Sequence, residues 1–225
     1  MRNNFKNKRM NRTWFVASLL LLASNVSAQQ DEYAKKILDA MSEKYRAMSS
    51  YKVNFTYRLQ NQVEGVDEEF TGEITVKGEK YRLLLNEQEI FNDGKTIWTY
   101  IPEAREVNVD NYLPDEGDLS PSNIYTAYRK GYRYRFIEEA NKNNLVLNVI
   151  ELQPENPKDP NKTFQRVVLN ISKADNLIDN WQMFDRMGNV FTYYINTFAP
   201  NVRATDDMFV FDPSKYPGVE VIDMR

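Results

Sequence analysis

The polar and apolar positions of residues 31–48 recur with the period of an α-helix. The apolar positions lie three or four residues apart and form one stripe, which consists of Tyr33, Ile37, Ala40, Met41, Tyr45 and Met48. Asp31 and Glu32 fall in the first turn, where carboxylates interact favourably with the helix dipole. The pattern therefore predicts one amphipathic helix that ends at the serines 49–50 and packs its stripe against another layer.

From residue 51 the period changes to two, which is the pattern of a half-buried β-strand. Val53, Phe55 and Tyr57, for example, alternate with polar residues. Similar segments follow, separated by turn signals such as KGEK, NDGK and RMGN, and the last of them are FVFD (209–212) and VEVID (219–223). The sequence thus predicts roughly ten antiparallel strands with short connections.

Residues 110–120 interrupt this pattern with Pro, Gly and acidic residues, which are typical of a loop. A short helix is predicted next, because Ser120 can cap it, Pro121 suits its first position and Gly131 can end it. Its apolar stripe consists of Ile124, Ala127 and Tyr128. A helix of about ten residues is marginal alone, so we expect it to lie against the sheet.

The order of these elements predicts a mainly β fold with helical insertions. No helix alternates with each strand, which argues against a parallel βαβ fold. A long antiparallel sheet twists and curls, and a curled sheet has a concave face. Large apolar residues from several strands gather on the expected concave face, and the N-terminal helix and the short helix are the two elements available to cover it. We find no internal repeat and expect a single domain.

Residues 1–28 have the pattern of a cleaved secretory signal peptide. A basic stretch is followed by the apolar run WFVASLLLLAS and by VSA, which predicts cleavage after Ala28. The alternative, a transmembrane anchor, needs about 20 apolar residues, more than this run provides. The mature domain would then be residues 29–225, and removal of the basic segment makes it more acidic than the net charge of −3 of the whole chain. This charge argues against a nucleic-acid-binding protein.

The chain contains no His and no Cys, which excludes the catalytic triads and the metal sites that need either residue. No Cys follows the signal segment, so we expect a soluble rather than a lipid-anchored protein. Adjacent carboxylates occur at Glu138 and Glu139 and at Asp206 and Asp207, but neighbours on a strand point to opposite faces. The acidic loop of Asp115, Glu116 and Asp118 matches no cation-binding spacing. We therefore predict no catalytic residue, no metal site and no cofactor.

Four segments, taken in order, resemble the LolA family of periplasmic lipoprotein carriers. They are ILDAMSEKYRAMSSYKVNFTY (37–57), GEITVKGEKYRL (72–83), IFNDGKTIWTYIP (90–102) and FVFDPSKYPGVEVID (209–223), and DGKTIW is the most specific element. The resemblance implies an unclosed β-barrel with a helical lid over an apolar cavity. It also implies that this cavity takes the acyl chains of a lipoprotein.

The resemblance implies that the apolar face of the sheet is a binding site. The residues expected to line the cavity are Phe55, Tyr57, Tyr81, Leu83, Trp98, Tyr100, Trp181 and Tyr193, and those expected to form the lid are Ile124, Ala127 and Tyr128. The alternative is that these residues are the ordinary core of a β-sandwich. In the strand 96–101 both faces are apolar. We expect Trp98 and Tyr100 to face the cavity, and Ile97 and Ile101 to lie beneath the N-terminal helix.

One departure from the family pattern concerns the lid. Members closer to the best-known pattern of the family carry an Arg shortly after the Val-Lys pair, and this Arg hydrogen-bonds the lid in the closed state. Here Gly78 stands at that place, and Arg82 or Arg105 is the candidate substitute.

The resemblance also implies the partners. They are acylated lipoproteins, an inner-membrane lipoprotein-releasing ABC transporter and an outer-membrane acceptor, and the carrier is expected to be a monomer in the periplasm. Two other hypotheses remain open on the residues alone. One is an envelope sensor of lipid or lipoprotein with the same fold, and the other is an enzyme that uses carboxylates on glycans.

Overall fold

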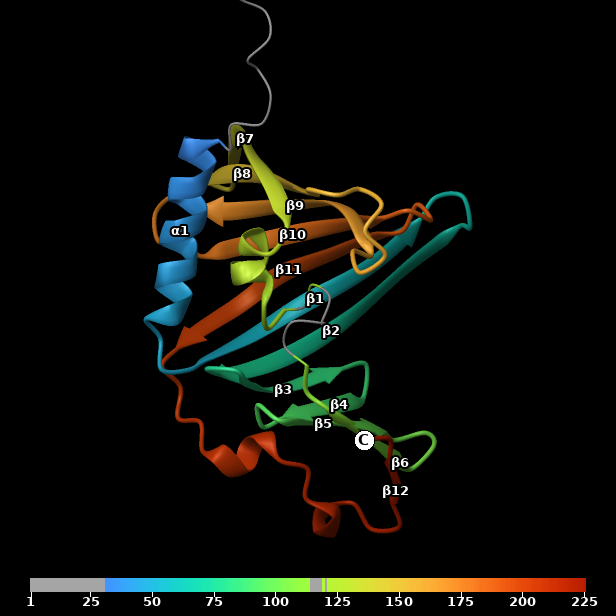
Figure 1. The fold of residues 1–225 in the computed structure, drawn as a ribbon. Coiled ribbons are helices and arrows are strands. Elements are labelled where there is room, and N and C mark those ends of the chain that lie inside the picture. Colours follow the sequence, from blue (N-terminus) through green and yellow to red (C-terminus); the bar gives the residue numbers. More distant parts are fainter. Residues whose placement is uncertain (1–30, 114–118, 120) are drawn as a thin grey trace, which may run out of the picture. The chain divides into compact units, whose positions relative to one another are not determined.

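The computed structural model describes residues 31–113, 119 and 121–225 (Figure 1). The predicted signal peptide, the helix cap at Ser120 and the acidic loop residues Asp115, Glu116 and Asp118 lie outside this part of the chain. In the part described, no helix is both long and apolar enough to cross a membrane.

The predicted N-terminal helix is present as α1 (Glu32–Arg46). Asp31 is its N-cap and precedes the first turn, because its side chain accepts hydrogen bonds from the backbone N–H groups of Tyr33 and Ala34. The buried residues of α1 are Ala34, Ile37, Leu38, Met41, Ser42 and Tyr45. Tyr33 differs from the predicted stripe, since 49% of it is exposed, and Met48 lies beyond the end of the helix.

The strands form one twelve-stranded sheet within the described residues, with the order β12-β6-β5-β4-β3-β2-β1-β11-β10-β9-β8-β7. Their bounds are β1 (Tyr51–Asn61), β2 (Val66–Lys77), β3 (Lys80–Leu85), β4 (Gln88–Asn92), β5 (Thr96–Ile101), β6 (Glu106–Asn111), β7 (Tyr132–Lys142), β8 (Leu145–Pro154), β9 (Phe164–Ser172), β10 (Ile178–Asp185), β11 (Val190–Pro200) and β12 (Glu220–Asp223). The sheet consists of two meanders, β1–β6 and β7–β11, which are joined where β1 pairs with β11.

The predicted fold class is confirmed. All neighbouring strands pair antiparallel except β12, which lies parallel to β6. The two edge strands β7 and β12 do not pair with each other, so the sheet is an unclosed barrel. Twelve twisted strands curl strongly (Figure 1), and curling gives the sheet an inner and an outer face.

The turn predicted at Asp93 and Gly94 is also confirmed. Gly94 has a φ of +90°, which a residue without a Cβ adopts readily. The Asp93 carboxylate accepts hydrogen bonds of 2.8 Å from the backbone N–H groups of Lys95 and Thr96. These contacts fix where β4 ends and β5 begins, and therefore fix the register of this hairpin.

The main core lies on the inner face of the sheet. Its buried side chains include Ile37, Leu38 and Met41 of α1 together with Phe55, Ile74, Val76, Ile150, Leu152, Leu169, Ile171, Trp181 and Met183 of the strands. Two elements cover it, namely α1, which runs past the ends of β9, β10 and β11, and the short helix η1 (Ile124–Arg129) (Figure 1).

A second, smaller cluster lies on the outer face of β4–β6. It consists of Phe91, Val107 and Phe211, with Trp98, Tyr100, Tyr216 and Val219 packed around them. The segment after β11 supplies its cover and contains two 3₁₀ helices, η2 (Asp206–Phe209) and η3 (Pro213–Lys215). The strand predicted for residues 209–212 is therefore wrong, because Phe209 and Phe211 are buried as part of this covering segment.

The strand pairing corrects the expected orientation of residues 96–101. Directly opposed residues of neighbouring strands point to the same face. Ile97 lies opposite Asn92, which lies opposite Tyr81 of the main core, whereas Trp98 lies opposite Phe91 of the second cluster. Ile97 therefore shares the inner face with Tyr81, and Trp98 and Tyr100 point outward. The sequence suggested the reverse because it did not show that the C-terminal segment covers the outer face.

Candidate functional site

The inner face of the sheet brings together six of the eight residues predicted to line a cavity. Phe55, Tyr57, Tyr81, Leu83, Trp181 and Tyr193 all belong to or pack against the main core. Trp98 and Tyr100 belong instead to the second cluster on the outer face. The candidate site is therefore the inner face of β1–β3 and β9–β11, under α1 and η1.

A row of aromatic rings crosses the inner face where the two meanders meet. Trp181 lies opposite Tyr193, and Tyr193 lies opposite Tyr57. The rings of Trp181 and Tyr193 stack with centroids 4.5 Å apart and an angle of 5°, and those of Tyr193 and Tyr57 are 4.9 Å apart. Alternating strand residues place all three rings on one face. Together they form a wide apolar surface that can repack at a modest rotamer cost.

This aromatic surface carries no charge. Burial raises the pKa values of Tyr57, Tyr81 and Tyr193, so their hydroxyl groups stay neutral. Trp181 is only 2% exposed, and its Nε1–H has no hydrogen-bond partner among the described residues. A site without charge and with an unused donor suits a ligand that is mostly hydrocarbon and carries a few acceptor oxygens.

The predicted lid helix is a 3₁₀ helix, η1, and is shorter than the sequence suggested. Ile124 and Tyr128 are 2% and 4% exposed and belong to the main core, whereas the side chain of Ala127 lies outside the described part. Tyr125 stacks on Tyr45 of α1, with ring centroids 4.9 Å apart. Short segments adopt the tighter 3₁₀ form readily. The Pro and Gly signals therefore predicted where this helix lies but not that it is a 3₁₀ helix.

A hydrogen-bonded latch joins η1 to α1. The Tyr128 hydroxyl donates to Asp39 Oδ1 over 2.5 Å, and Arg129 Nε donates to the Tyr128 hydroxyl over 2.8 Å. Arg129 Nη2 also lies 3.3 Å from Asp39 Oδ1, and Lys35 holds the other carboxylate oxygen at 2.6 Å. The bonds from Lys35 and then from Tyr128 hold the pKa of Asp39 below its ordinary value. The carboxylate is therefore charged at neutral pH and anchors the lid.

Neither arginine proposed to lock the lid contributes to this latch. Arg82 pairs with Glu89 at 2.6 Å on the outer face and lies 5.0 Å from the ring centroid of Phe91. Arg105 occupies a turn with a φ of +55°, and its carbonyl accepts a hydrogen bond from the backbone N–H of Glu220. Arg105 thus helps to fix β12 at the sheet edge. Sequence spacing offered no signal for a bond between Asp39 and Tyr128, which are far apart along the chain.

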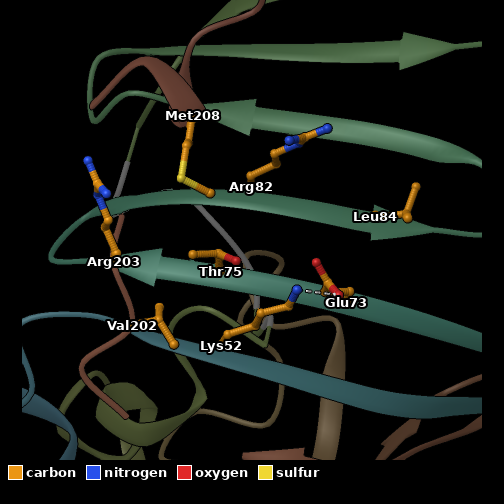
Figure 2. Close-up of a pocket in the computed structure, with 8 residues that line it drawn as sticks. All are labelled: Lys52, Glu73, Thr75, Arg82, Leu84, Val202, Arg203 and Met208. Atoms are coloured by element: carbon orange, nitrogen blue, oxygen red, sulfur yellow. Dashed lines mark ion pairs between the residues drawn. The ribbon is translucent and has the colours of Figure 1, made fainter. Parts of the chain in front are cut away.

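Clefts lie near these elements and also on the outer face of the sheet. The lid cleft, of about 390 Å³, lies between the C-terminal end of α1, the start of β1, the β2–β3 turn and η1. An apolar cleft of about 370 Å³ lies nearby and is lined by Ala47, Met48, Leu177, Phe198 and Pro200, among others. The outer cleft, of about 250 Å³, lies on the other face (Figure 2). Met48 lines both of the first two, so they lie on either side of one flexible side chain.

Residues 31–113, 119 and 121–225 contain no group of three or more Asp or Glu side chains that could hold a metal ion. The buried Asp185 accepts hydrogen bonds from the backbone N–H groups of Met187 and Asn189, whereas two other carboxylates pair with cations. Asp39 pairs with Lys35, and the buried Glu151 lies between Arg135 and Arg166 at 2.9 and 2.8 Å.

The sequence profile of the family described as outer membrane lipoprotein carrier protein LolA matches residues 46–212. An outer-membrane lipoprotein carrier protein of Photobacterium profundum is 24% identical over 94% of this chain and 98% of its own length. A protein of the same name from Histophilus somni (strain 2336) is 25% identical over 62% of each chain.

Two solved structures are similar in fold. An uncharacterized conserved protein from Thermus thermophilus has a TM-score of 0.56 at 14% identity and covers 85% of this chain and 99% of its own. A DUF1329 family protein from Desulfovibrio piger has a TM-score of 0.50 at 12% identity and covers 84% and 100%.

Proposed function

Because the chain belongs to the LolA family of outer membrane lipoprotein carrier proteins, we propose that it binds the acyl chains of lipoproteins on its inner face. It collects this cargo at the inner membrane, crosses the periplasm and delivers the cargo to the outer membrane. The observation that carries the proposal is an apolar, aromatic inner face whose short cover, η1, is tied down by one polar latch.

The energies are compatible with reversible transport. Burial of an acyl chain contributes about 0.8 kcal/mol per CH₂, so one long chain contributes on the order of ten kcal/mol. In the structure the side chains of Ile124 and Tyr128 fill part of the inner face. Cargo must displace them, so its net affinity is the difference between the filled open state and the empty closed state. This competition keeps the cargo from binding irreversibly.

The hydrogen bonds of the latch add a small free-energy cost to the opening of the lid. Each of its hydrogen bonds contributes about 0.5–1.5 kcal/mol net, and bonds to a charged group contribute somewhat more. This cost is well below the gain from one acyl chain, so cargo can open the lid. An opened lid would free for hydrocarbon the part of the inner face that Ile124 and Tyr128 fill.

The proposed partners follow from this role. They are acylated lipoproteins, the inner-membrane ABC transporter that releases them and an outer-membrane acceptor. We propose a monomeric carrier without enzymatic activity, since its family consists of carriers and the inner face holds no acid–base pair among the described residues.

The two tryptophans of residues 29–225 allow a direct test, because Trp181 lies on the inner face and Trp98 on the outer face. A synthetic diacylated lipopeptide with brominated acyl chains quenches tryptophan fluorescence on contact. We expect it to quench Trp181 in a Trp98→Phe variant and to leave Trp98 unaffected in a Trp181→Phe variant. Quenching of Trp98 alone would move the site to the outer face, and no quenching of either would refute acyl binding.

Transport itself needs a second experiment. Purified protein is added to spheroplasts that retain newly made lipoprotein, and the supernatant is examined for a soluble lipoprotein–carrier complex. We expect such a complex to form. Its absence, with the lipopeptide still bound in the fluorescence assay, would leave a lipid-binding protein that is not a carrier.

A further inference from the structure

One hydrogen-bond donor in the row of aromatic rings is buried without an acceptor. Trp181 is 2% exposed, and its Nε1–H has no partner in the part of the chain that the structure describes. A buried donor that has lost water and gained no other partner lowers stability. Most buried polar groups are therefore paired, and an unpaired one indicates that a water molecule or a ligand supplies the missing acceptor.

The side chains next to Trp181 on the inner face are apolar. Leu169 lies opposite it on β9, and Met183 is the next residue of β10 on the same face. Both are buried. A buried water molecule needs about two to four polar partners, and neither of these side chains has an oxygen or nitrogen atom. The surroundings therefore favour an acceptor on a ligand over a resident water molecule.

The direction of this donor is fixed by the stack. The ring of Tyr193 lies parallel to the indole, with an interplanar angle of 5° and centroids 4.5 Å apart. Ser42 and Ser172 also have a buried Oγ atom without a partner among the described residues, but a hydroxyl proton rotates to suit a neighbour. An indole proton lies in the plane of its ring, so it cannot turn unless the stack breaks. The acceptor must therefore come to Trp181.

Two hydroxyl groups continue the line of donors. Tyr193 and Tyr57 are half-buried with ring centroids 4.9 Å apart, and neither hydroxyl group hydrogen-bonds to a described residue. Burial raises the pKa values of both, so they keep their protons at neutral pH. The row thus offers N–H and O–H groups within an uncharged, apolar surface. A carbonyl oxygen on a hydrocarbon chain matches both properties.

We propose that Trp181 Nε1–H donates a hydrogen bond to the carbonyl oxygen of a bound acyl group, at the ester bond that joins the chain to its cargo. The proposal rests on the proposed acyl binding by the inner face and specifies which linkage this face recognises. The hydrocarbon supplies most of the affinity through burial. The carbonyl supplies selectivity, because a chain with an ether link brings no carbonyl oxygen to the donor. The protein therefore prefers acyl chains to alkyl chains of equal length.

The bond is favourable because the donor is already out of water. In the empty protein Trp181 Nε1–H is buried and unpaired, so the binding of a carbonyl needs no further desolvation of the indole. A site that pairs with one group of its ligand also discriminates against an analogue that lacks this group, because the buried donor then stays unpaired. The unpaired donor of the empty state thus becomes a source of selectivity.

Trp98 is a matched control in the same chain. It is half-buried on the outer face, where an indole N–H can donate to solvent. Trp98 and Trp181 are the only tryptophans of residues 29–225, so each can be observed or replaced alone. We expect the linkage of the ligand to affect Trp181 and not Trp98.

Calorimetric titration with two lipopeptides tests the proposal. One is a synthetic diacylated lipopeptide with ester-linked chains, and the other is its dialkyl ether analogue with chains of equal length. We expect the wild type to bind the ester about fivefold more tightly, a factor that one neutral hydrogen bond supplies. Trp181→Phe, which keeps an aromatic ring and lacks the N–H, should bind the two probes within about twofold of each other. Trp98→Phe should keep the wild-type preference.

A second replacement keeps the shape of the indole. In the Trp98→Phe background, incorporation of β-(3-benzothienyl)alanine for tryptophan puts at position 181 a ring of similar size without an N–H group. This protein should lose the preference for the ester even if Trp181→Phe does not fold. The ¹⁵N–¹H spectrum of Trp98→Phe gives a readout that does not depend on affinity. Its indole N–H signal should move downfield with the ester probe and much less with the ether probe.

The outcomes separate the hydrogen bond from acyl binding. Equal affinity of the wild type for the two probes, or a preference that survives in the benzothienyl protein, would overturn the hydrogen bond and leave acyl binding intact. An indole signal that moves equally with both probes would do the same, since it would report contact with hydrocarbon alone. Failure of both probes to bind would overturn acyl binding by the inner face and this proposal with it.

Discussion

Asp31 holds two elements together with one carboxylate. Its Oδ1 accepts hydrogen bonds of 3.0 Å from the N–H groups of Tyr33 and Ala34 at the start of α1. Its Oδ2 accepts a bond of 2.8 Å from the backbone N–H of Phe136, on the edge strand β7. The same residue therefore starts the helix and satisfies a donor at the open edge of the sheet, where such a group invites pairing with another chain.

The Asp31→Ala variant should lose both contacts and about 1–2 kcal/mol of unfolding free energy. The bond from Phe136 is the main cause that holds the pKa of Asp31 below its ordinary value. The contribution of Asp31 is therefore present above the unfolded-state pKa of about 3.9 and is lost as the pH falls below it. Urea unfolding of both proteins at pH 7 and pH 3 measures this, and an equal difference at the two pH values would contradict it.

Residue 72 must be a glycine, because the ring of Phe55 lies opposite it on β1 and leaves no room for a side chain. A Cβ at Gly72 would lie 2.3 Å from Cζ of Phe55, a side chain that is only 1% exposed. We expect Gly72→Ala to lower the unfolding free energy by about 1–3 kcal/mol through overpacking. The clash predicts non-additivity, so Gly72→Ala should cost much less in a Phe55→Leu background. A double-mutant cycle by urea unfolding measures the coupling, and strict additivity would show that the ring moves aside freely.

The latch between η1 and α1 should control how quickly the lid opens. Tyr128→Phe keeps the ring in the core and removes the hydroxyl that bonds to Asp39. We expect a loss of about 1–2 kcal/mol of unfolding free energy and faster association of the brominated lipopeptide, because the closed empty state is weakened. Stopped-flow quenching of Trp181 in a Trp98→Phe background measures the rate.

Lys35→Met is the matched control for the latch. It removes the partner of the other Asp39 oxygen and leaves the bond from Tyr128 in place. Its association rate should stay close to that of the wild type. If Tyr128→Phe bound the lipopeptide no faster than Lys35→Met, opening of η1 would not limit entry.

The elements differ in how well the sequence predicted them, and the difference is physical. The stripe of Ile37, Met41 and Tyr45 and the alternation from Val53 to Tyr57 each have one buried face, so a single period identifies them. Every residue of strand β5 is half-buried, so neither face stands out, and its outer face packs against Phe211, Tyr216 and Val219, far along the chain. The periodicity of the sequence does not show which segment of the chain packs against each apolar face of the strand.

The same limit applies to the candidate site. The alternation of the strands was enough to gather Phe55, Tyr57 and Tyr193 on one face. The latch of Asp39, Tyr128 and Arg129 was missed, because Asp39 and Tyr128 are 89 positions apart along the chain and no local pattern links them. The local sequence pattern predicts on which face of the sheet a residue lies. Contacts between side chains that are distant in the sequence depend on the complete topology.

The molecule has two clusters on opposite faces of one sheet, and they should respond separately to substitution. Phe211 is 5% exposed and packs against Phe91, Tyr100 and Tyr216, so Phe211→Ala should cost about 3–5 kcal/mol. We expect the emission of Trp98 to shift to longer wavelength while that of Trp181 stays unchanged. Emission spectra of the Trp181→Phe and Trp98→Phe backgrounds measure this. Loss of lipopeptide binding in Phe211→Ala would show that the two faces are coupled.

The pairing of β1 with β11 sets the order in which the chain can fold. The first and the last long strands meet at the centre of the sheet, where Phe55 lies opposite Ile195 and Tyr57 opposite Tyr193. Until the residues of β11 have been synthesised, the two meanders share no ladder and the aromatic row is incomplete. Closing so long a loop is entropically costly and slows folding. A chain that ends before residue 190 therefore lacks the central ladder of the sheet, and we expect such a truncated chain not to assemble the row of aromatic rings.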